Sequence, residues 1–362
     1  MGEATILVWR IGNIGDIVVA VPAFRALRRH FRDRRLVLMT GPGRKGLPCA
    51  RDVVGPAGIF DEIVEYLPGD LRHPLRLARL LARIGRMAPE LIVHLDLVGA
   101  SRWRNLRDRT FFRLAGCRRL VGFHPLGLAP GLRCRVAETG VYPKETDRLM
   151  AIVAEAGVTD LSVDFDLGLT REERSRVDAI WREAVGGHRG PVVAICPGAK
   201  FPVKRWPIER FAVVAGRLAE DFGAAFLVLG GREDFASGEL LRARLPRLVN
   251  LAGRTNVRLD CGLLRGCDFY LGNDTGTMHL AAAAGTRCVA VFTARSLPET
   301  WHPYGDGHRV HIKSVPCAGC RKESCESMEC ILSVTVDEVL QSCYEVLRAR
   351  AGGRPCAASA GR

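Results

Sequence analysis

The stretch Gly272-Asn273-Asp274-Thr275-Gly276-Thr277-Met278-His279 lies between two short apolar segments, 268–271 and 287–292. This order predicts a strand that turns directly into a helix, because Gly272 and Gly276 permit a tight backbone turn without side-chain clashes. The first turn of such a helix offers N–H groups and the positive end of the helix dipole, which together bind an anion such as phosphate. Asp274 repels a phosphate, so we expect it either to cap the helix or to accept hydrogen bonds from a sugar. A phosphate and a sugar at one loop indicate a nucleotide-sugar ligand.

Short β-branched segments alternate with helical patterns along the chain on both sides of this stretch. They occupy 5–10, 36–39, 91–94 and 120–121, and then, after the pattern stops at 164–169, 192–196, 225–229, 248–251, 268–271 and 288–292. Such alternation predicts parallel sheets covered by helices. The chain has 362 residues, which is longer than the chains that a single hydrophobic core usually supports. We therefore expect an α/β protein with two Rossmann-like domains in series.

A polar helical stretch at 171–183, followed by a Gly-rich and Pro-containing segment at 186–191, marks the predicted connection between the domains. We therefore expect an N-terminal domain at 1–185 and a C-terminal domain at 186–350 that ends in an amphipathic helix. The tail at 351–362 is rich in Gly, Ala and Ser, which predicts disorder.

The charge balance favours an anionic partner. Lys and Arg outnumber Asp and Glu by 53 to 39, which gives a net charge of +14 and suits nucleic acid, an acidic membrane surface or a phosphorylated substrate. The first apolar stretch, 6–9, is soon broken by Arg10, Gly12 and Asp16, so it is neither a signal-peptide core nor a membrane span. Thirteen cysteines without a secretory signal indicate a reducing compartment, and we expect a cytoplasmic protein.

Asp16 is the predicted catalytic residue of the first half. The first strand ends at Arg10 and leads through a glycine-containing turn to Asp16, just before a helical pattern that Pro22 should kink or restart. Ligands of open α/β sheets bind at the carboxyl ends of strands, where Asp16 could accept the proton of an attacking hydroxyl group. The alternative, at even weight, is that Asp16 merely caps its helix.

The predicted donor-binding residues of the second half lie in loops that follow strands. A Gly/Pro-constrained loop at 196–207 presents cations that could neutralise a diphosphate, although each alone could be a solvated surface charge. Glu233 follows a Gly-Gly pair and could approach a nucleoside, or else Glu233 or Asp234 could cap a helix. His279 could face the anion or serve as a structural hydrogen-bonding group. The predicted donor set is Lys200, Lys204, Arg205, Glu233, Asp274, Thr275, Gly276 and His279.

Two basic regions occur in the first half. The segment 71–87 predicts an amphipathic helix with arginines on one stripe, which could rest on an anionic lipid surface. A solvated face over a packed face is the favoured alternative. Arg102, Arg104 and Arg107 follow the strand at 91–94, and we expect them to recognise a phosphorylated acceptor.

Four cysteines, Cys317, Cys320, Cys325 and Cys330, form the spacing C-x2-C-x4-C-x4-C. Thiolates this close in sequence could hold a structural zinc ion. Free thiols or a redox-labile pair are alternatives of about equal weight, since the spacing differs from that of common zinc fingers. We predict no catalytic part for these residues.

Taken together, several segments resemble the heptosyltransferases of glycosyltransferase family 9. They are Ile6-Leu7-Val8, Ile14-Gly15-Asp16, Pro22-Ala23, Pro197-Gly198-Ala199, Lys204-Arg205-Trp206-Pro207, Asp274-Thr275-Gly276, His279, Ala282-Ala283, Gly285 and Phe292. These matches occur in the family's order between about residues 5 and 305, and their joint spacing is specific.

The resemblance implies a GT-B fold, in which two Rossmann-like domains face a central cleft. It implies inverting transfer of a heptose or related sugar from an ADP-sugar, bound by the C-terminal half, to an anionic lipid-linked acceptor of lipopolysaccharide-core type. No metal or cofactor would be required for catalysis. Asp16 would be the general base, Lys204 a ligand of the donor phosphate, and Asp274, Thr275, Gly276 and His279 contacts of the donor sugar and diphosphate. A peripheral contact with the inner face of the cytoplasmic membrane stays open.

Two other classes of protein are weaker alternatives. Rossmann-like halves also suit an NAD-dependent dehydrogenase or a nucleotide-sugar epimerase, but the glycine fingerprint after the first strand is missing. The net charge and the four clustered cysteines would suit a nucleic-acid-binding protein with a metal site. An aromatic content of only 7% and the lack of a recognised nucleic-acid module make this alternative the weakest, and we expect no nucleic-acid partner.

Overall fold

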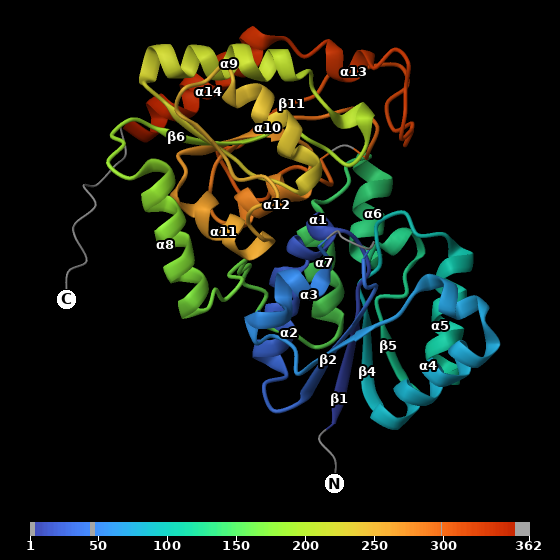
Figure 1. Ribbon diagram of the computed structural model, residues 1–362. Helices are drawn as coiled ribbons and strands as arrows, with labels where there is room; N and C mark the ends of the chain where they lie inside the picture. The colour runs from blue at the N-terminus through green and yellow to red at the C-terminus, as the bar shows by residue number, and fades with distance from the viewer. Residues whose placement is uncertain (1–3, 44–47, 298, 352–362) are drawn as a thin grey trace. The chain divides into compact units, whose positions relative to one another are not determined.

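The chain folds into two compact units. The computed structural model describes residues 4–43, 48–297 and 299–351, so all but the first residue of the predicted tail lies outside these ranges (Figure 1). Unit 1 extends to Arg171 and takes in residues 299–301, and unit 2 begins at Glu172. The expected boundary at residue 185 lies at the end of α8 (Arg171–Val185), and nearly all of that helix is counted with unit 2.

Unit 1 is built on a parallel sheet with the strand order β3-β2-β1-β4-β5. Its elements are β1 (Thr5–Trp9), α1 (Ile14–Val18), α2 (Val21–His30), β2 (Arg35–Thr40), α3 (Ala50–Val54), β3 (Glu62–Glu65), α4 (Pro74–Met87), β4 (Pro89–His94), α5 (Arg102–Leu114), β5 (Arg119–Val121), α6 (Pro130–Thr139) and α7 (Glu145–Glu155), with short 3-10 turns at Gly55–Ala57, Pro68–Arg72 and Pro125–Gly127. Figure 1 shows α2 and α7 on one face of this sheet and α4 and α5 on the other.

The apolar residues of the central strands explain this layering. In parallel register, Leu7 of β1 lies beside Val37 of β2 and Ile92 of β4, and all three are buried on the face that α4 and α5 cover. Leu80 and Ile84, one turn apart, are the buried side chains of α4 on that face. The expected interruption at Pro22 is confirmed, because α1 ends before it and α2 restarts with Pro22 in its first turn.

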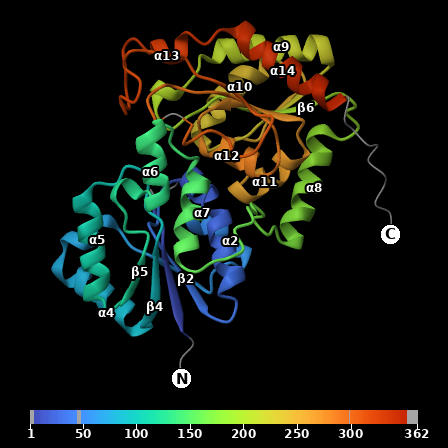
Figure 2. The ribbon, with the colours of Figure 1, turned by 180° about the vertical axis from the view of Figure 1, so that it is seen from behind.

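Unit 2 contains a second parallel sheet, with the order β11-β10-β9-β6-β7-β8. Its elements after α8 are β6 (Val192–Cys196), α9 (Ile208–Phe222), β7 (Ala225–Val228), α10 (Phe235–Arg242), β8 (Leu248–Asn250), α11 (Val257–Gly266), β9 (Phe269–Asn273), α12 (Gly276–Ala283), β10 (Cys288–Val291), β11 (Arg309–His311), α13 (Glu329–Leu332) and α14 (Val336–Ala351), with 3-10 turns at Pro202–Lys204 and Arg232–Asp234. Figures 1 and 2 show α9 and α14 on one face, with α11 and α12 on the opposite face.

The core of unit 2 joins its central strands to α9 and α14. Val193 and Ile195 of β6 pack with Phe211 of α9 and Val339 of α14. The helix α9 ends where Gly223 adopts a left-handed conformation, which suits glycine at a helix C-terminus.

The predicted α/β class with two parallel-sheet domains is therefore confirmed. The sequence pattern did not predict β3 and β11, which are outer strands of their sheets, four and three residues long, and have a charged or polar residue at each end. Outer strands need only one apolar face, so they lack the continuous apolar run that marks a central strand. None of the helices within the described residues is long and apolar enough to cross a bilayer.

Candidate active site

Each sheet has a point at which its strand order reverses. In unit 1 this switch point lies between β1 and β4, and in unit 2 it lies between β6 and β9. At a switch point the loops at the carboxyl ends of the two strands diverge and leave room for a ligand. Asp16 follows β1, Lys204 follows β6 and Asp274 follows β9, so these predicted residues all lie in the connections that leave strands at switch points.

Asp16 sits at the start of the short helix α1. Its Oδ2 atom accepts a hydrogen bond from the backbone N–H of Asn13 at 2.6 Å and from Asn13 Nδ2 at 3.3 Å, which forms a capping box. Gly12 has a φ of +153°, and a Cβ atom there would lie 2.3 Å from Asp16 Cβ, so this turn requires glycine. The capping alternative for Asp16 is thus observed, and both of these hydrogen bonds use one carboxylate oxygen.

Burial raises the pKa of Asp16 above its usual value, and the nearby Arg10 guanidinium partly offsets this effect. A carboxylate with a raised pKa accepts a proton more readily near neutral pH. The environment of Asp16 therefore suits a general base as well as a helix cap.

A buried charge network holds the loop after β1 in place. Arg10, which is fully buried, donates to the backbone oxygen of Asp16 at 2.8 Å and to Glu145 Oε1 at 3.1 Å. Glu145 also accepts from Arg148 Nε at 2.7 Å, and Arg148 in turn donates to the backbone oxygen of Gly127 at 2.5 Å. Because Arg10 also donates to the backbone oxygen of Leu95 at 3.0 Å, this network joins the ends of β1 and β4 to α7.

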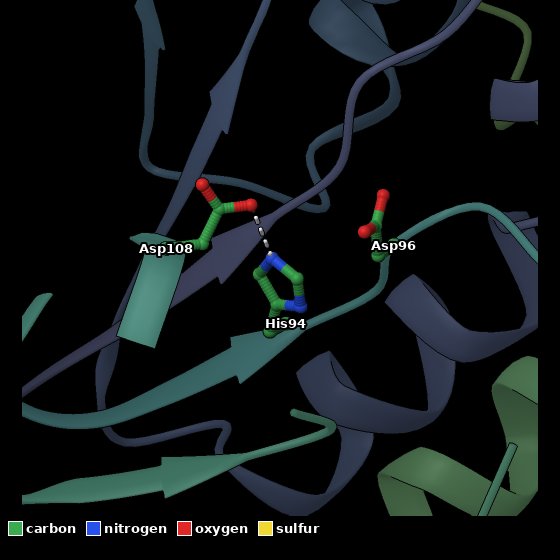
Figure 3. A group of neighbouring side chains, drawn as sticks. All are labelled: His94, Asp96 and Asp108. Atoms are coloured by element: carbon green, nitrogen blue, oxygen red, sulfur yellow. Dashed lines mark ion pairs between the residues drawn. The ribbon is translucent and has the colours of Figure 1, made fainter. Parts of the chain in front are cut away.

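Three buried side chains, His94, Asp96 and Asp108, gather beside this network (Figure 3). Asp96 accepts from Arg104 at 2.6 Å, Asp108 accepts from Arg107 Nε at 2.8 Å, and His94 Nε2 lies 3.5 Å from Asp108. Two of the predicted acceptor-binding arginines, Arg104 and Arg107, are thus ion-paired within unit 1. Since each carboxylate already has an arginine, the group is close to charge balance and holds α5 to the end of β4. The third predicted residue, Arg102, is exposed at the start of α5.

In unit 2, Lys204 and Asp274 form an ion pair between Lys204 Nζ and Asp274 Oδ2. Asp274 is 6% exposed and its backbone N–H donates to Val291 O at 3.2 Å, so the residue still belongs to the end of the strand. The N-cap of α12 is Thr275. The suggestion that Asp274 caps this helix is therefore wrong, because the helix begins one residue later.

Asn273 ties the loops that follow β6 and β9 together. Its Nδ2 atom donates to the backbone oxygen of Pro197 at 2.7 Å, and its Oδ1 atom accepts from the backbone N–H of Trp206 at 3.1 Å. The first turn of α12 is supported by Tyr270, whose hydroxyl group donates to Asn273 O at 3.2 Å and lies 3.3 Å from Thr275 Oγ1. Gly272 makes room for that hydroxyl group, since a Cβ atom there would lie 2.3 Å from it.

A further carboxylate, Asp234, lies between the loops after β6 and β7. Its Oδ2 atom accepts from the backbone N–H of Gly231 at 3.1 Å, and a Cβ atom at Gly198 would overlap Oδ1. Burial and the neighbouring Glu233 raise the pKa of Asp234 to about 6. Asp234 is thus the capping residue of this turn, whereas Glu233 is exposed.

The remaining predicted donor residues differ in their surroundings. Lys200 is exposed with its Nζ 5.0 Å from the centre of the Phe201 ring, and Arg205 donates to the backbone oxygen of Ala199 at 2.9 Å. His279 is buried on α12, one turn after Thr275, and Gly276 is the first residue of that helix. Lys204, Asp274, Thr275 and Gly276 therefore form the part of the predicted set that surrounds one helix N-terminus.

The four clustered cysteines lie in the segment that precedes and begins α13. Cys317 and Cys320 are exposed, and Cys325 and Cys330 are half-buried. Hydrogen bonding from Ser327 lowers the pKa of the Cys325 thiol. Among the described residues, the group with three ligand atoms within 4.8 Å of one another is formed by His94, Asp96 and Asp108, not by these sulfurs. The structural zinc ion stays a prediction.

Sequence reasoning did not single out Arg10, Glu145 or Asn273 as parts of a site. Arg10 did carry a signal, since a charged residue directly after a run of buried strand residues needs a buried partner. Its partner Glu145 is 135 positions away, and nothing in the local sequence connects the two.

Two doubly wound parallel sheets with polar loops at their switch points define a class of α/β proteins that bind ligands at the carboxyl ends of strands. Within this class, the chain belongs to glycosyltransferase family 9 (heptosyltransferase), whose family profile matches residues 135–331. This match confirms the resemblance found in the sequence. It does not support the dehydrogenase, epimerase or nucleic-acid-binding alternatives.

Known relatives agree with the family assignment. Lipooligosaccharide heptosyltransferase 2 of Haemophilus influenzae is 33% identical over 178 residues, which cover 46% of this chain and 51% of the relative. The chain thus spans about half the length of the curated relatives it matches. Two solved structures share the fold: a family 9 glycosyl transferase from Veillonella parvula, with a TM-score of 0.73, 16% identity and coverage of 96% of this chain and 98% of that one, and the E. coli ADP-heptose lps heptosyltransferase II, with a TM-score of 0.68, 19% identity and coverage of 96% and 99%.

Proposed function

We propose that this protein is an inverting glycosyltransferase that transfers a heptose or a related sugar from an ADP-sugar to an anionic, lipid-linked acceptor of lipopolysaccharide-core type. The observation that carries the proposal is the presence of complementary groups at the two switch points. One loop presents the half-buried carboxylate of Asp16, and the other presents Lys204 beside the N-terminus of α12. The choice of a heptose and of a lipopolysaccharide-core acceptor rests on the names of the relatives, which are heptosyltransferases 2 of lipooligosaccharide or lipopolysaccharide.

The donor diphosphate would bind at the N-terminus of α12. The first turn of this helix, which begins at Gly276, offers backbone N–H groups that have no acceptor within the helix, and Lys204 adds a positive charge beside it. The carboxylate of Asp274, which already holds Lys204, would accept hydrogen bonds from hydroxyl groups of the sugar. This arrangement binds an anion and a polyol side by side.

In the proposed reaction, Asp16 takes a proton from a hydroxyl group of the acceptor while that oxygen attacks the anomeric carbon of the donor. The bond from the anomeric carbon to the diphosphate oxygen breaks, and ADP leaves from the opposite face, so the configuration inverts. Lys204 and the N-terminus of α12 stabilise the negative charge that grows on the diphosphate. In this proposal, these two groups alone stabilise the leaving diphosphate, and no metal ion or other cofactor is required.

Substitution of Asp16 tests the proposed base. Asp16→Asn keeps an oxygen that can accept the hydrogen bond from Asn13 but cannot take a proton. We expect the turnover number for sugar transfer to fall by about 10²–10⁴-fold, with ADP-sugar binding measured by calorimetry nearly unchanged. Full turnover in this variant would rule out the base.

Asp52→Asn is the matched control. Asp52 forms the same capping box at the start of α3, where its Oδ2 atom accepts from the backbone N–H of Cys49 at 2.7 Å. The control variant makes the same change in an equivalent capping box that follows β2, which does not border the switch point, so it should keep its turnover. A loss of equal size in both variants would show that Asp16 acts only as a cap.

The donor is identified by titration of the wild-type protein with ADP-, UDP- and GDP-sugars, followed by transfer to truncated lipopolysaccharide. We expect an ADP-sugar to bind most tightly and to be consumed. If a UDP- or GDP-sugar binds most tightly instead, the ADP-sugar is not the donor. The role of Asp16 as general base can then be tested with that other donor.

A further inference from the structure

Unit 1 contains an apolar cavity of about 400 Å³ between α4, α5 and the ends of β1 and β2. Its walls include Met39, Leu77, Leu81, Trp103 and Phe111. At its base, Trp9 Nε1 donates to the hydroxyl group of Tyr66 at 2.9 Å, so these polar groups are satisfied within the protein. The volume lies within the roughly 300–1,000 Å³ of small-molecule sites, and the lining suits an aliphatic ligand.

The helix α4 does not bury its whole apolar stripe. The sequence favoured a helix whose basic face is in water and whose apolar face packs on the protein. Only Leu80 and Ile84 are buried on this helix, however. Leu77 and Leu81 line the cavity instead, and Leu75 is 66% exposed. The packed face is therefore incomplete.

Large apolar side chains are also exposed along α5. Trp103 is 80% exposed, Leu106 55% and Leu114 73%, and all three line the cavity. Figures 1 and 2 show α4 and α5 side by side, and Leu77 and Leu81 of α4 line the same cavity as these three residues of α5. An apolar patch of this kind at the mouth of a cavity marks a site of interaction with a partner or a membrane.

The same two helices carry mainly positive charge. Their exposed arginines include Arg76, Arg79 and Arg86 on α4, and Arg102, Arg109 and Arg113 on α5. The acidic residue of these two helices, Asp108, is buried and already paired. Exposed charge of one sign on the two helices that border an apolar cavity complements a surface that is anionic outside and aliphatic within.

We propose that the α4–α5 surface of unit 1 docks on an anionic phospholipid bilayer. Trp103, Leu106 and Leu114 enter the boundary between headgroups and acyl chains, the arginines contact lipid phosphates, and one acyl chain occupies the cavity. The proposal gives a site and a ligand to the membrane contact that the basic helix suggested. It rests on unit 1 alone and does not depend on the proposed transfer reaction.

The chemistry favours lipid over other polyanions. Nucleic acid would use the arginines but leave Leu75, Leu106 and Leu114 in water, and it has no aliphatic chain to fill the cavity. A protein partner would have to combine an acidic surface with a long apolar side chain. A bilayer supplies both features at once.

Vesicle flotation tests the docking surface with the full chain. We expect wild-type protein to float with vesicles of phosphatidylcholine and phosphatidylglycerol, but not with phosphatidylcholine alone. Arg79→Gln/Arg86→Gln/Arg109→Gln should weaken binding by on the order of 10²-fold. The matched control, Arg217→Gln/Arg244→Gln/Arg247→Gln, removes three exposed arginines from unit 2 and should bind as the wild type does.

The apolar contribution has its own variant. Trp103→Ser/Leu106→Ser/Leu114→Ser removes exposed side chains, so the variant should fold, which circular dichroism can check. We expect it to lose binding at high salt, where screening leaves only the apolar contact. The control Val213→Ser/Leu240→Ser/Leu332→Ser replaces exposed apolar residues of unit 2 and should keep binding.

Occupation of the cavity is tested at Thr110, an exposed residue of its wall. Thr110→Trp fills the cavity and should weaken vesicle binding at least tenfold, whereas Thr110→Ser should not. Wild-type binding by Thr110→Trp would overturn the acyl-chain site. Equal flotation with neutral and anionic vesicles, no flotation at all, or binding to single-stranded RNA in place of vesicles would overturn the docking proposal. Each outcome can be read without any measurement of sugar transfer.

Discussion

Asp260 of unit 2 shows how burial alone can make one residue sensitive to pH. It lies on α11, is 6% exposed and accepts a hydrogen bond from the hydroxyl group of Thr255. Burial raises the pKa of Asp260 to about 7. The folded protein therefore holds this proton up to about pH 7, whereas the unfolded chain releases it near pH 4.

This difference predicts a pH-dependent stability. Because the folded state binds more protons than the unfolded state between about pH 4 and 7, the contribution of Asp260 to the free energy of unfolding falls by about 1.4 kcal/mol per pH unit there. Asp260→Asn removes the titration, so the variant should gain stability relative to the wild type as the pH rises. Chemical denaturation at pH 4.5 and 7.5 measures this, and an equal difference at both values would contradict the raised pKa.

At the scale of single residues, the loops at the strand ends were predictable and their detailed contacts were not. Asp16 and Asp274 each follow an apolar run and precede a helical pattern, so their placement at switch points could be inferred from local sequence. That Asp274 pairs with Lys204 depends on two strands that lie about 70 positions apart in the chain. Capping of the helix by Asp274, one of the two alternatives for this residue, differs from the observed cap at Thr275 by one position, because sequence patterns do not define helix ends to one residue.

Secondary-structure elements bring the predicted donor groups together. β6 and β9 are neighbours in the sheet, and Cys196 of β6 lies in register with Gly272 of β9. The loops that follow them therefore start at the same level, which allows Asn273 to bind the backbone of Pro197. The ion pair between Lys204 and Asp274 is a consequence of this register.

The ion pair gives a test at the element scale. Lys204→Gln should weaken binding of ADP or an ADP-sugar by about 10–100-fold, the usual worth of a charge-assisted hydrogen bond, as measured by calorimetry. It should also lower stability, because the buried Asp274 loses its partner. The double variant Lys204→Gln/Asp274→Asn should recover stability without recovering ADP binding.

Lys313→Gln provides the control. Lys313 also pairs with a carboxylate of unit 2, Glu338 on α14, but it belongs to the segment after the outer strand β11. We expect this variant to bind ADP as the wild type does. Equal losses of ADP binding for Lys204→Gln and Lys313→Gln would show that Lys204 acts only through general charge.

At the scale of the whole molecule, each unit depends on contacts between distant parts of the chain. In unit 1, Glu145 pairs with Arg10 and Arg148, and its backbone N–H donates to Thr300 O at 2.9 Å. The segment 299–301 thus returns to unit 1 after most of unit 2 has been built. This network stabilises the first switch point rather than a local helix.

Glu145→Gln should therefore destabilise unit 1 by roughly 3–5 kcal/mol, because it leaves two buried guanidinium groups without a full counter-charge. Hydrogen exchange should rise in β1, α1 and α7, while β6 and α9 of unit 2 keep their protection. The control Glu155→Gln lies on the same helix and breaks the partly exposed pair with His124, which should cost at most about 1 kcal/mol. Equal exchange in the two variants would show that the buried network adds no stability.

The sequence by itself determined the class of this protein. Apolar segments of strand length that alternate with helical patterns dictate two parallel sheets, and glycine-containing turns before Asp16 and Asp274 predict where ligands could bind. These features are local, since strand propensity, helix periodicity and tight turns each depend on a few neighbouring residues. The outer strands β3 and β11 were not predicted because they are short and end in charged or polar residues, which leaves at most two adjacent apolar residues in each.

The tertiary structure alone decided which distant residues meet. The network of Arg10 and Glu145, the tie that Asn273 makes between two loops, and the unfilled cavity between α4 and α5 depend on strand order and register. A helix that is amphipathic in sequence shows an apolar stripe, but only packing shows how much of that stripe is covered. Strand order and packing are global properties, because they arise from the burial of side chains that lie far apart along the chain.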